Sequence, residues 1–399
     1  MAQRTVRLYI YNASSVPCPA RPSLNSMDRF EHKLPALFAA GSQPMLPHGV
    51  ELTDDPMMAD VLYHPACLVR SFFTLRAAHS RKQAEVEARA LEATVLAQIT
   101  ATGREHMPHI IHALRCRGDA ADVTGEITDA RYFFPRLWWG GTFARFCVET
   151  FSRGVLLDTS TSFAMPYCPA APAAGGSEEG AASTPPSAAR RTRVLFIGSN
   201  FSSASRKPLL RQRGEALAAL SRTPGHEAML LHRREMRHNP SLVAEVQQRS
   251  ARRMREATYT LCPPGDAPES SRIYQALAAG SIPLVGSAFV PAPLANEVNW
   301  SSVTHVIATD GDGRLVLPDA EREAALRRAV WRHRRSFECE PSSQLFVAYV
   351  ARALRRVAAW GEQSWQEELA RASMPALERS CLRCGRMAVG ARCCESSAV

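Results

Sequence analysis

Residues 257–285 read ATYTLCPPGDAPESSRIYQALAAGSIPLV, and this stretch decides the fold. Residues 258–262 are rich in residues that favour β-strands, and the Pro-Pro-Gly after them predicts a turn. A pair of serines can then cap a helix whose apolar residues recur at helical spacing. After Gly280, which suits the position just past a helix end, residues 282–285 predict a second buried strand. The strand, helix and strand form a βαβ unit, which predicts an α/β fold with a parallel sheet.

The loop before this helix carries groups that favour anions. Backbone N–H groups at a helix N-terminus attract negative charge, and Arg272 lies in the first turn. Ser270 and Ser271 add hydroxyl donors. A diphosphate would therefore fit here, at the carboxyl end of a parallel strand. A well-capped helix with a solvated arginine is the alternative explanation, because capped helices are common.

The same stretch resembles the signature of the exostosin-like glycosyltransferases. Its L-C-P-P-G-D, S-S-R and G-S-I-P-L-V segments are similar, in the same order, to that family's pattern. Those enzymes have a GT-B fold, in which two Rossmann-like domains face each other across a cleft, and they transfer sugars from nucleotide donors. The resemblance therefore implies an α/β chain of GT-B type. It also implies donor-binding roles for Gly265, Asp266, Ser270, Ser271 and Arg272.

Three positions depart from the family pattern. Gln275 stands where the family usually has Asp or Glu, a residue expected to hold the donor ribose, and the resemblance gives that role to Gln275. An amide can hydrogen-bond hydroxyl groups, but it lacks the charge of a carboxylate. Asn299 replaces a usual Asp, and Arg131 and Tyr132 stand in place of an Asp-His pair. These departures leave open a non-catalytic protein that binds glycan or nucleotide.

The composition admits several classes of partner. The 399 residues are enough for two or three domains, and the formal net charge is +10. A basic surface favours sugar nucleotides, acidic glycans, nucleic acid or anionic lipid, although a solvated arginine-rich surface explains the charge equally well. Aromatic and basic residues do not interleave as in RNA-binding domains, so we expect no nucleic-acid partner. The 11 cysteines are scattered, which does not suggest a compact disulfide framework.

The sequence shows neither a signal peptide nor a membrane span. The N-terminus runs directly into a predicted strand at residues 6–11, and no apolar run approaches the ~20 residues that a membrane helix needs. We therefore expect no transmembrane helix in this chain. The resembling family is usually anchored in the Golgi, so the resemblance implies a Golgi location.

A segment rich in Pro, Ala, Gly and Ser divides the chain, and its composition predicts a flexible linker. A linker between two halves suits a fold that closes on its ligand. The predicted parts are an N-terminal acceptor-side Rossmann-like domain (1–168), the linker (169–193), a nucleotide-sugar-binding Rossmann-like domain (194–318), C-terminal helices (319–372) and a cysteine-containing tail (373–399).

The first half is expected to supply the catalytic base. Residues 53–65, TDDPMMADVLYHP, are similar to a family stretch and predict a short helix followed by a strand at 61–63. His64 ends that strand at the edge where α/β proteins bind ligands, although a lone histidine is more often structural. The residues do not single out one base, and the candidates are Asp60, His64, Asp129 and Glu149.

Two histidines follow a long helix predicted over residues 71–102. The spacing of His109 and His112 would suit one helix face and a metal, but Pro108 and the apolar neighbours favour a buried edge segment. Further on, Asp310-Gly311-Asp312 has the form of a metal-binding D-x-D, yet its glycines after a strand favour a turn. The cysteines of the tail likewise favour disulfides or disorder over zinc. We therefore expect no metal and no cofactor.

The second half restarts with a strand predicted at residues 194–197. A serine-rich loop follows, and Arg206 and Lys207 precede a helix predicted from Pro208. Basic charge near a helix N-terminus suits a phosphate, and a solvated basic helix start is an equal alternative. The family has a basic residue opening this helix, so the resemblance implies that Arg206 and Lys207 bind the donor.

The resemblance implies an inverting glycosyltransferase. It would move a sugar from a nucleotide donor, a UDP-sugar, to a hydroxyl of a glycan or glycoprotein. The alternatives are a non-catalytic exostosin-like protein that binds glycan or nucleotide, and a basic scaffold for nucleic acid or membrane, which rests on charge alone.

Overall fold

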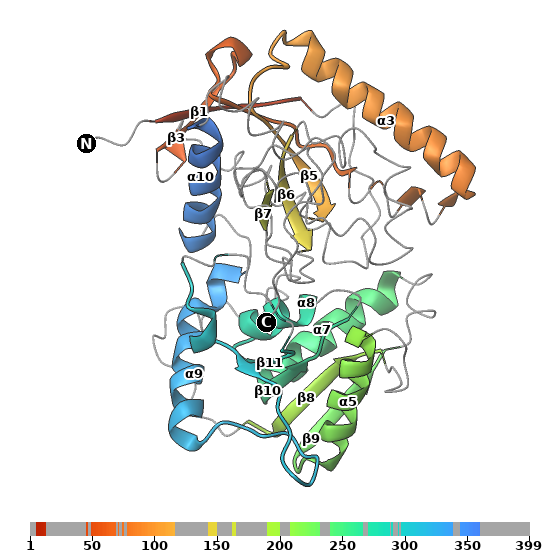
Figure 1. Cartoon of the computed structure of the whole chain (residues 1–399), viewed down its shortest axis with the longest axis vertical. Helices are drawn as coiled ribbons and strands as arrows, with labels where there is room; N and C mark the ends of the chain where they lie inside the picture. Colours follow the sequence, from red (N-terminus) through yellow and green to blue (C-terminus); the bar gives the residue numbers. More distant parts are fainter. Residues whose placement is uncertain are drawn as a thin grey trace, which may run out of the picture.

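The structure, a computed structural model, contains two sheets that lie in separate halves of the molecule (Figure 1). One sheet has seven strands and the other has five, and each is built from one half of the chain. The described residues are 5–12, 45–46, 49–68, 71, 74–75, 78–115, 143–149, 162–164, 190–199, 208–231, 240–265, 270–287, 289, 294, 297–337 and 344–359.

The first sheet has β1 in its interior. Its strand order is β2-β3-β1-β4-β5-β6-β7, and every neighbouring pair is parallel except β2 and β3. All three residues of β4 are buried, as expected of a strand covered on both faces. The strands are β1 Val6–Ile10, β2 Met45–Leu46, β3 Val50–Thr53, β4 Val61–Tyr63, β5 His109–Arg115, β6 Ala144–Glu149 and β7 Ser162–Ala164.

The second sheet is parallel throughout, with the order β12-β11-β10-β8-β9. Every residue of β10 and β11 is buried, as expected of parallel strands covered on both faces. Two parallel sheets in two Rossmann-like domains confirm the predicted α/β fold of GT-B type. The strands are β8 Thr192–Gly198, β9 His226–Leu230, β10 Ala257–Cys262, β11 Ile282–Val285 and β12 His305–Val306.

Helices pack on both sheets. In the second domain α7 contacts β8 and β10, α8 contacts β10 and β11, and α9 contacts β11. Within the described part of the chain, no helix combines the length and the apolar character needed to cross a membrane. The helices are η3 Pro56–Met58, α3 Arg81–Ala101, α5 Pro208–Arg222, α7 Pro240–Glu256, α8 Ser271–Ala278, η6 Trp300–Ser302, α9 Ala320–His333, η7 Arg334–Phe337 and α10 Gln344–Ala358.

Two sequence predictions in the first domain are wrong. The single helix predicted over residues 71–102 is interrupted, because the Ser80 hydroxyl accepts a hydrogen bond from the N–H of Gln83 at 3.4 Å and caps a new helix. The predicted edge segment is instead the interior strand β5, which lies between β4 and β6. Pro108 precedes this strand, and its carbonyl accepts a hydrogen bond from the N–H of Leu62 at 3.0 Å.

The predicted βαβ unit is confirmed. β10 and β11 are parallel neighbours, with Tyr259 opposite Ile282. Ser270 caps α8, and Gly280 ends it with φ of +73°. The Arg190 guanidinium donates to the carbonyls of Ala257 and Gly280, which ties the start of β10 to the end of α8.

Gly280→Ala is expected to destabilise the fold by about 1–3 kcal/mol. Alanine is strained at positive φ, at a cost of roughly 1–2 kcal/mol, and its Cβ would lie 3.2 Å from the Trp331 ring. Urea unfolding measures the change. The control is Gly311→Ala, where no atom lies within 4 Å of the added Cβ. Equal stability of the two variants would contradict this account of the helix end.

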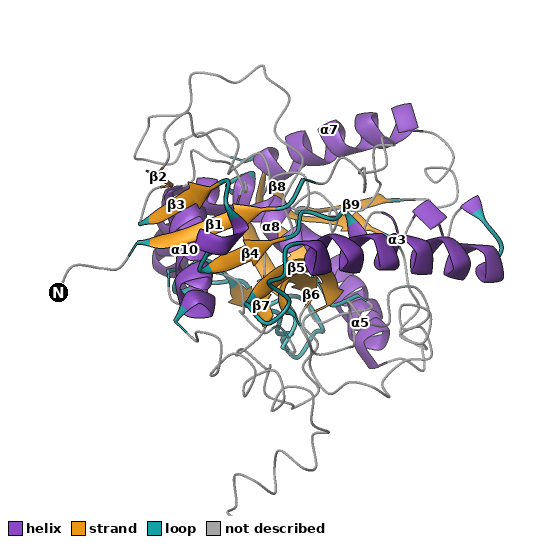
Figure 2. Cartoon of the chain, turned by 90° about the horizontal axis from the view of Figure 1, so that it is seen from above, coloured by secondary structure: helices purple, strands orange, loops and turns teal. Residues whose placement is uncertain are grey.

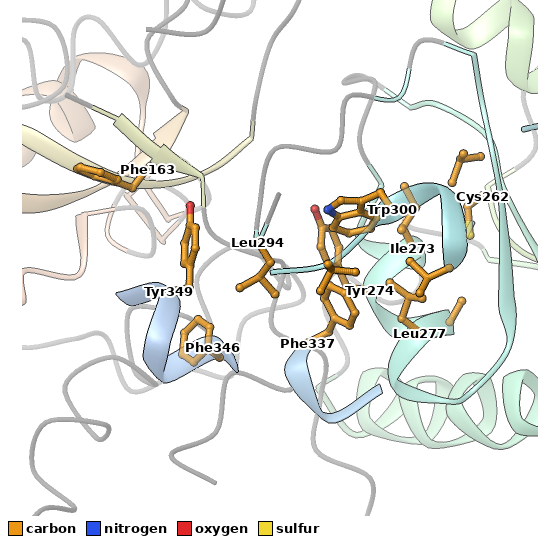
Figure 3. Packing of buried hydrophobic residues seen from close by; sticks show 14 of the residues in the cluster. Phe163, Cys262, Ile273, Tyr274, Leu277, Leu294, Trp300, Phe337, Phe346 and Tyr349 are labelled. Atoms are coloured by element: carbon orange, nitrogen blue, oxygen red, sulfur yellow. The ribbon is translucent and has the colours of Figure 1, made fainter. Parts of the chain in front are cut away.

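The C-terminal helix α10 returns to the first domain. It follows α9 and η7 in the chain, but it contacts β1, β3 and β4, and both overall views place it beside β1 and β3 (Figures 1 and 2). Phe346 and Tyr349 of α10 lie near Leu294, while Phe337 packs on Tyr274 of α8 with ring centroids 6.1 Å apart (Figure 3). One buried apolar cluster therefore joins the two domains.

Candidate functional site

The second sheet has one point at which its strand order reverses. From β8 the chain moves outward to β9, crosses back to β10, and continues outward on the other side to β11 and β12. Open parallel sheets bind ligands outside the carboxyl ends of the strands at such a switch point. The predicted donor loop follows β10, so it lies at the switch point between β8 and β10.

Arg213 reaches this loop from the other side of the switch point. It lies on α5, the helix that follows β8, and its Nε donates to the carbonyl of Pro264 at 3.0 Å. Its Nη2 lies so close to Gly265 that a Cβ at that position would be 3.0 Å away. A side chain at position 265 would therefore crowd the Arg213 guanidinium and make it shift, whereas glycine leaves it room.

Arg272 lies in the first turn of α8, as predicted. Its backbone N–H donates to the Ser270 hydroxyl at 3.3 Å, so that hydroxyl serves as the helix cap. Its guanidinium Nη1 donates to the side-chain oxygen of Gln275. The amide at the position where the family has an acid therefore orients Arg272. Ser271 opens the helix and is partly exposed.

Cys262, the last residue of β10, lies within electrostatic reach of both arginines. Burial raises the pKa of this thiol well above its usual range, and the positive charges of Arg272 and Arg213 oppose that rise. Cys262 is a free cysteine and is buried. Its thiol is therefore neutral and adds no negative charge to the loop, where two guanidiniums and a helix N-terminus converge.

Three of the predicted donor-binding residues lie outside the described residues. They are Arg206, Lys207 and Asp266. Their roles stay predictions. Arg213, by contrast, was missed by sequence reasoning, since an arginine on an amphipathic helix carries no local signal. Only the packing of α5 against the loop after β10 reveals it.

The first sheet has its own switch point, between β1 and β4. Tyr11 follows β1 and stacks on His64, which follows β4, with ring centroids 5.1 Å apart. The Nε2 of His64 lies 2.6 Å from the side-chain oxygen of Gln98 on α3. His64 is fully buried, and burial lowers its pKa to about 4. This environment favours the structural role for His64 over that of a base reached by an acceptor.

The other candidate bases occupy different places. Asp60 precedes β4 at the amino edge of the sheet, and its Oδ2 accepts a hydrogen bond from the N–H of Arg7 at 2.8 Å. That position is opposite to the edge where α/β sites form. Glu149 is the last residue of β6 and so lies at the carboxyl edge. Asp129 lies outside the described residues. Position in the sheet therefore favours Glu149 over Asp60.

The histidines and the D-x-D triplet have structural partners. The Tyr11 hydroxyl lies 2.9 Å from Nε2 of His109, and the Tyr63 hydroxyl lies 2.7 Å from Nε2 of His112. Side chains alternate along a strand, so His109 and His112 lie on opposite faces of β5. Asp310 closes the predicted turn, because its Oδ1 accepts hydrogen bonds from two backbone N–H groups that follow it. Among the described residues, no three potential metal ligands cluster.

The chain is similar to several known proteins. The chain is similar to HepE of Anabaena in complex with UDP (10% identity, TM-score 0.38, 88% of this chain and 100% of that chain). It is also similar to WaaG, a glycosyltransferase involved in lipopolysaccharide biosynthesis (11%, 0.34, 93% and 100%). No curated protein sequence gives a significant match. The family model of the Exostosin GT47 domain matches residues 3–311. The chain therefore belongs to the exostosin GT47 family, as its sequence predicted.

Proposed function

We propose that this chain is an inverting glycosyltransferase that moves a sugar from a UDP-sugar to a hydroxyl of a glycan. The observation that carries the proposal is the convergence of Arg213, Arg272 and the N-terminus of α8 at the switch point. Guanidinium groups bind phosphate oxygens in a bidentate manner, and a helix N-terminus adds N–H donors. Such a site suits the diphosphate of a nucleotide sugar, and the family resemblance supplies UDP.

The proposed reaction is a single displacement at the anomeric carbon. A carboxylate of the first domain takes the proton of the acceptor hydroxyl, whose oxygen forms the new bond on the face opposite to the diphosphate. The bond from the anomeric carbon to the diphosphate oxygen breaks, and UDP leaves with the electron pair. Arg213 and Arg272 stabilise the charge that develops on the leaving group. Glu149 and Asp129 are the candidates for the base.

One observation favours the alternative of a non-catalytic binding protein. Gln275 occupies the place of the family's acidic residue, and its side-chain oxygen is engaged by Arg272. A neutral amide holds a ribose less firmly than a carboxylate, because charged hydrogen bonds are about twice as strong as neutral ones. The chain would then bind the donor without transferring the sugar, because the anomeric carbon would not be aligned with the acceptor hydroxyl.

Calorimetric titration of the purified chain with UDP and UDP-sugars tests the proposal first. Saturable binding is expected, followed by transfer to a glycan acceptor. NMR of the product then reports its anomeric configuration, and an α-linked donor should give a β-linked product. Binding without transfer to any acceptor would favour the non-catalytic alternative. A folded chain that binds neither UDP nor any UDP-sugar would exclude both.

A further inference from the structure

A cavity of about 430 Å³ opens beside the switch point, and none of its residues belongs to the predicted donor site. It lies at the carboxyl end of β11 and alongside β12, next to the start of α9. Small-molecule sites in proteins have volumes of roughly 300–1,000 Å³. The residues that matter for its chemistry are Gly286, Ser287, Phe289, Trp300, His305 and Arg322.

The cavity adjoins the donor loop directly. Gly286 follows β11 and lines the cavity, and a Cβ at Gly286 would lie 2.7 Å from Cδ of Pro264. Pro264 is the residue whose carbonyl binds Arg213. The loops after β10 and β11 are therefore in contact, and the cavity begins where the diphosphate-binding loop ends.

One wall of the cavity is aromatic. The Phe289 N–H donates to the Gly286 carbonyl at 3.0 Å, and this turn holds the partly buried Phe289 ring in place. The ring meets Trp300 edge to face, with centroids 5.3 Å apart. Trp300 itself packs against Tyr274 and Phe337, so the wall rests on the core (Figure 3). A rigid aromatic face suits the apolar C–H face of a pyranose ring.

The rim of the cavity is polar. Ser287 presents an exposed hydroxyl, and the exposed Arg322 is anchored by a hydrogen bond from its guanidinium to the Ser301 carbonyl. Burial lowers the pKa of His305, and the charge of Arg322 lowers it further. The imidazole is therefore neutral at pH 7, and because its N–H donates to the backbone of Val316, its other ring nitrogen can accept a hydrogen bond from a ligand. These groups supply partners for several hydroxyls on one ring.

We propose that this cavity holds the sugar ring of the nucleotide donor. The inference rests on the proposed function, because the sugar can lie in this cavity only if the donor diphosphate binds at the adjacent loop. One aromatic wall and an open polar rim match a pyranose, which has an apolar face and a border of hydroxyls. A nucleobase is instead flat and apolar on both faces. The uridine accordingly lies on the other side of the diphosphate.

Saturation-transfer NMR tests the assignment with UDP, UDP-glucose, UDP-galactose, UDP-N-acetylglucosamine and UDP-glucuronate as probes. The probe that binds wild-type protein should receive saturation on both its sugar and its uridine protons. Ser287→Leu fills the cavity, so the sugar signals should disappear while the uridine signals remain. Phe289→Ala should weaken binding of that UDP-sugar by about two- to tenfold without changing binding of UDP. The control Ser221→Leu changes an exposed serine on α5 and should alter neither signal.

Three results would overturn the assignment. Unchanged sugar signals in Ser287→Leu would place the sugar elsewhere, and loss of the uridine signals as well would place the nucleoside in the cavity. Uridine signals without sugar signals in wild-type protein would show that the donor sugar is not held by this cavity. Absence of all signals in wild-type protein is a different outcome, since it removes the proposed function itself.

Discussion

Replacing Arg213 and Arg272 together by alanine is expected to abolish detectable UDP binding. Each guanidinium would make a charged hydrogen bond to the diphosphate, and such a bond contributes about 1.5–3 kcal/mol. Loss of both corresponds to roughly two to four powers of ten in Kd. The two arginines come from helices on either side of the switch point, so each single variant should retain part of the affinity. Calorimetric titration of the single and double variants measures these losses.

The matched control is Arg211→Ala on the same helix as Arg213. Arg211 is more than half exposed and forms a solvent-exposed ion pair with Glu215, with the closest atoms 3.8 Å apart. The substitution removes the same charge, but it leaves the donor loop intact. UDP affinity within about twofold of wild type is expected, because a single distant surface charge is screened by salt. If the Arg213 and Arg272 double variant bound UDP as tightly as this control, the diphosphate would lie elsewhere.

Acid is expected to remove about 6 kcal/mol of stability through two buried histidines. Burial lowers the pKa of His64 and of His109 to about 4, from an ordinary value of 6.5. Between pH 6.5 and 4 the unfolded chain binds protons that the folded chain excludes, so stability falls as the pH falls. The loss at pH 4 is about 3 kcal/mol for each histidine. This sum is comparable with the whole stability of many domains, about 5–15 kcal/mol.

Urea unfolding at pH 7.0, 5.5 and 4.0 measures this loss. His64→Gln and His109→Gln remove one titrating ring each, so each variant should lose about 3 kcal/mol less than wild type between pH 7 and 4. Each protein is compared by the change in its free energy of unfolding between pH 7 and pH 4. A variant that is less stable at every pH can therefore still be compared. The same pH dependence in wild type and in both variants would contradict this account of the acid sensitivity.

The βαβ unit was predictable because its signals are local. Ser270, Gly280 and the apolar runs around them each specify backbone geometry within a few residues, and the structure has the strand, cap and turn where these signals place them. The interruption before Ser80 has a local signal too, because serine is a preferred helix cap. The continuous apolar stripe of the surrounding sequence outweighed that signal in the prediction.

The position of Arg213 beside the donor loop was not predictable from local sequence signals. Arg213 contacts a loop 51 positions away along the chain, and this contact depends on how α5 packs at the switch point. The order of the strands likewise depends on long-range packing. The sequence near Pro108 contains no signal that β5 will have a neighbouring strand on each side. The periodicity of apolar residues indicates whether a segment is buried. Which elements pack against that segment depends on the fold as a whole.

Because α10 packs on the first sheet, the first domain can finish folding only after the C-terminal part of the chain has been synthesised. A ribosome releases β1, β3 and β4 early, yet the helix that covers them is made only after the entire second domain. Until α10 has been made, β1, β3 and β4 therefore lack the helix that packs on them. A cut within the predicted linker would have the same effect. The N-terminal fragment would carry these strands without α10 and would be prone to aggregate.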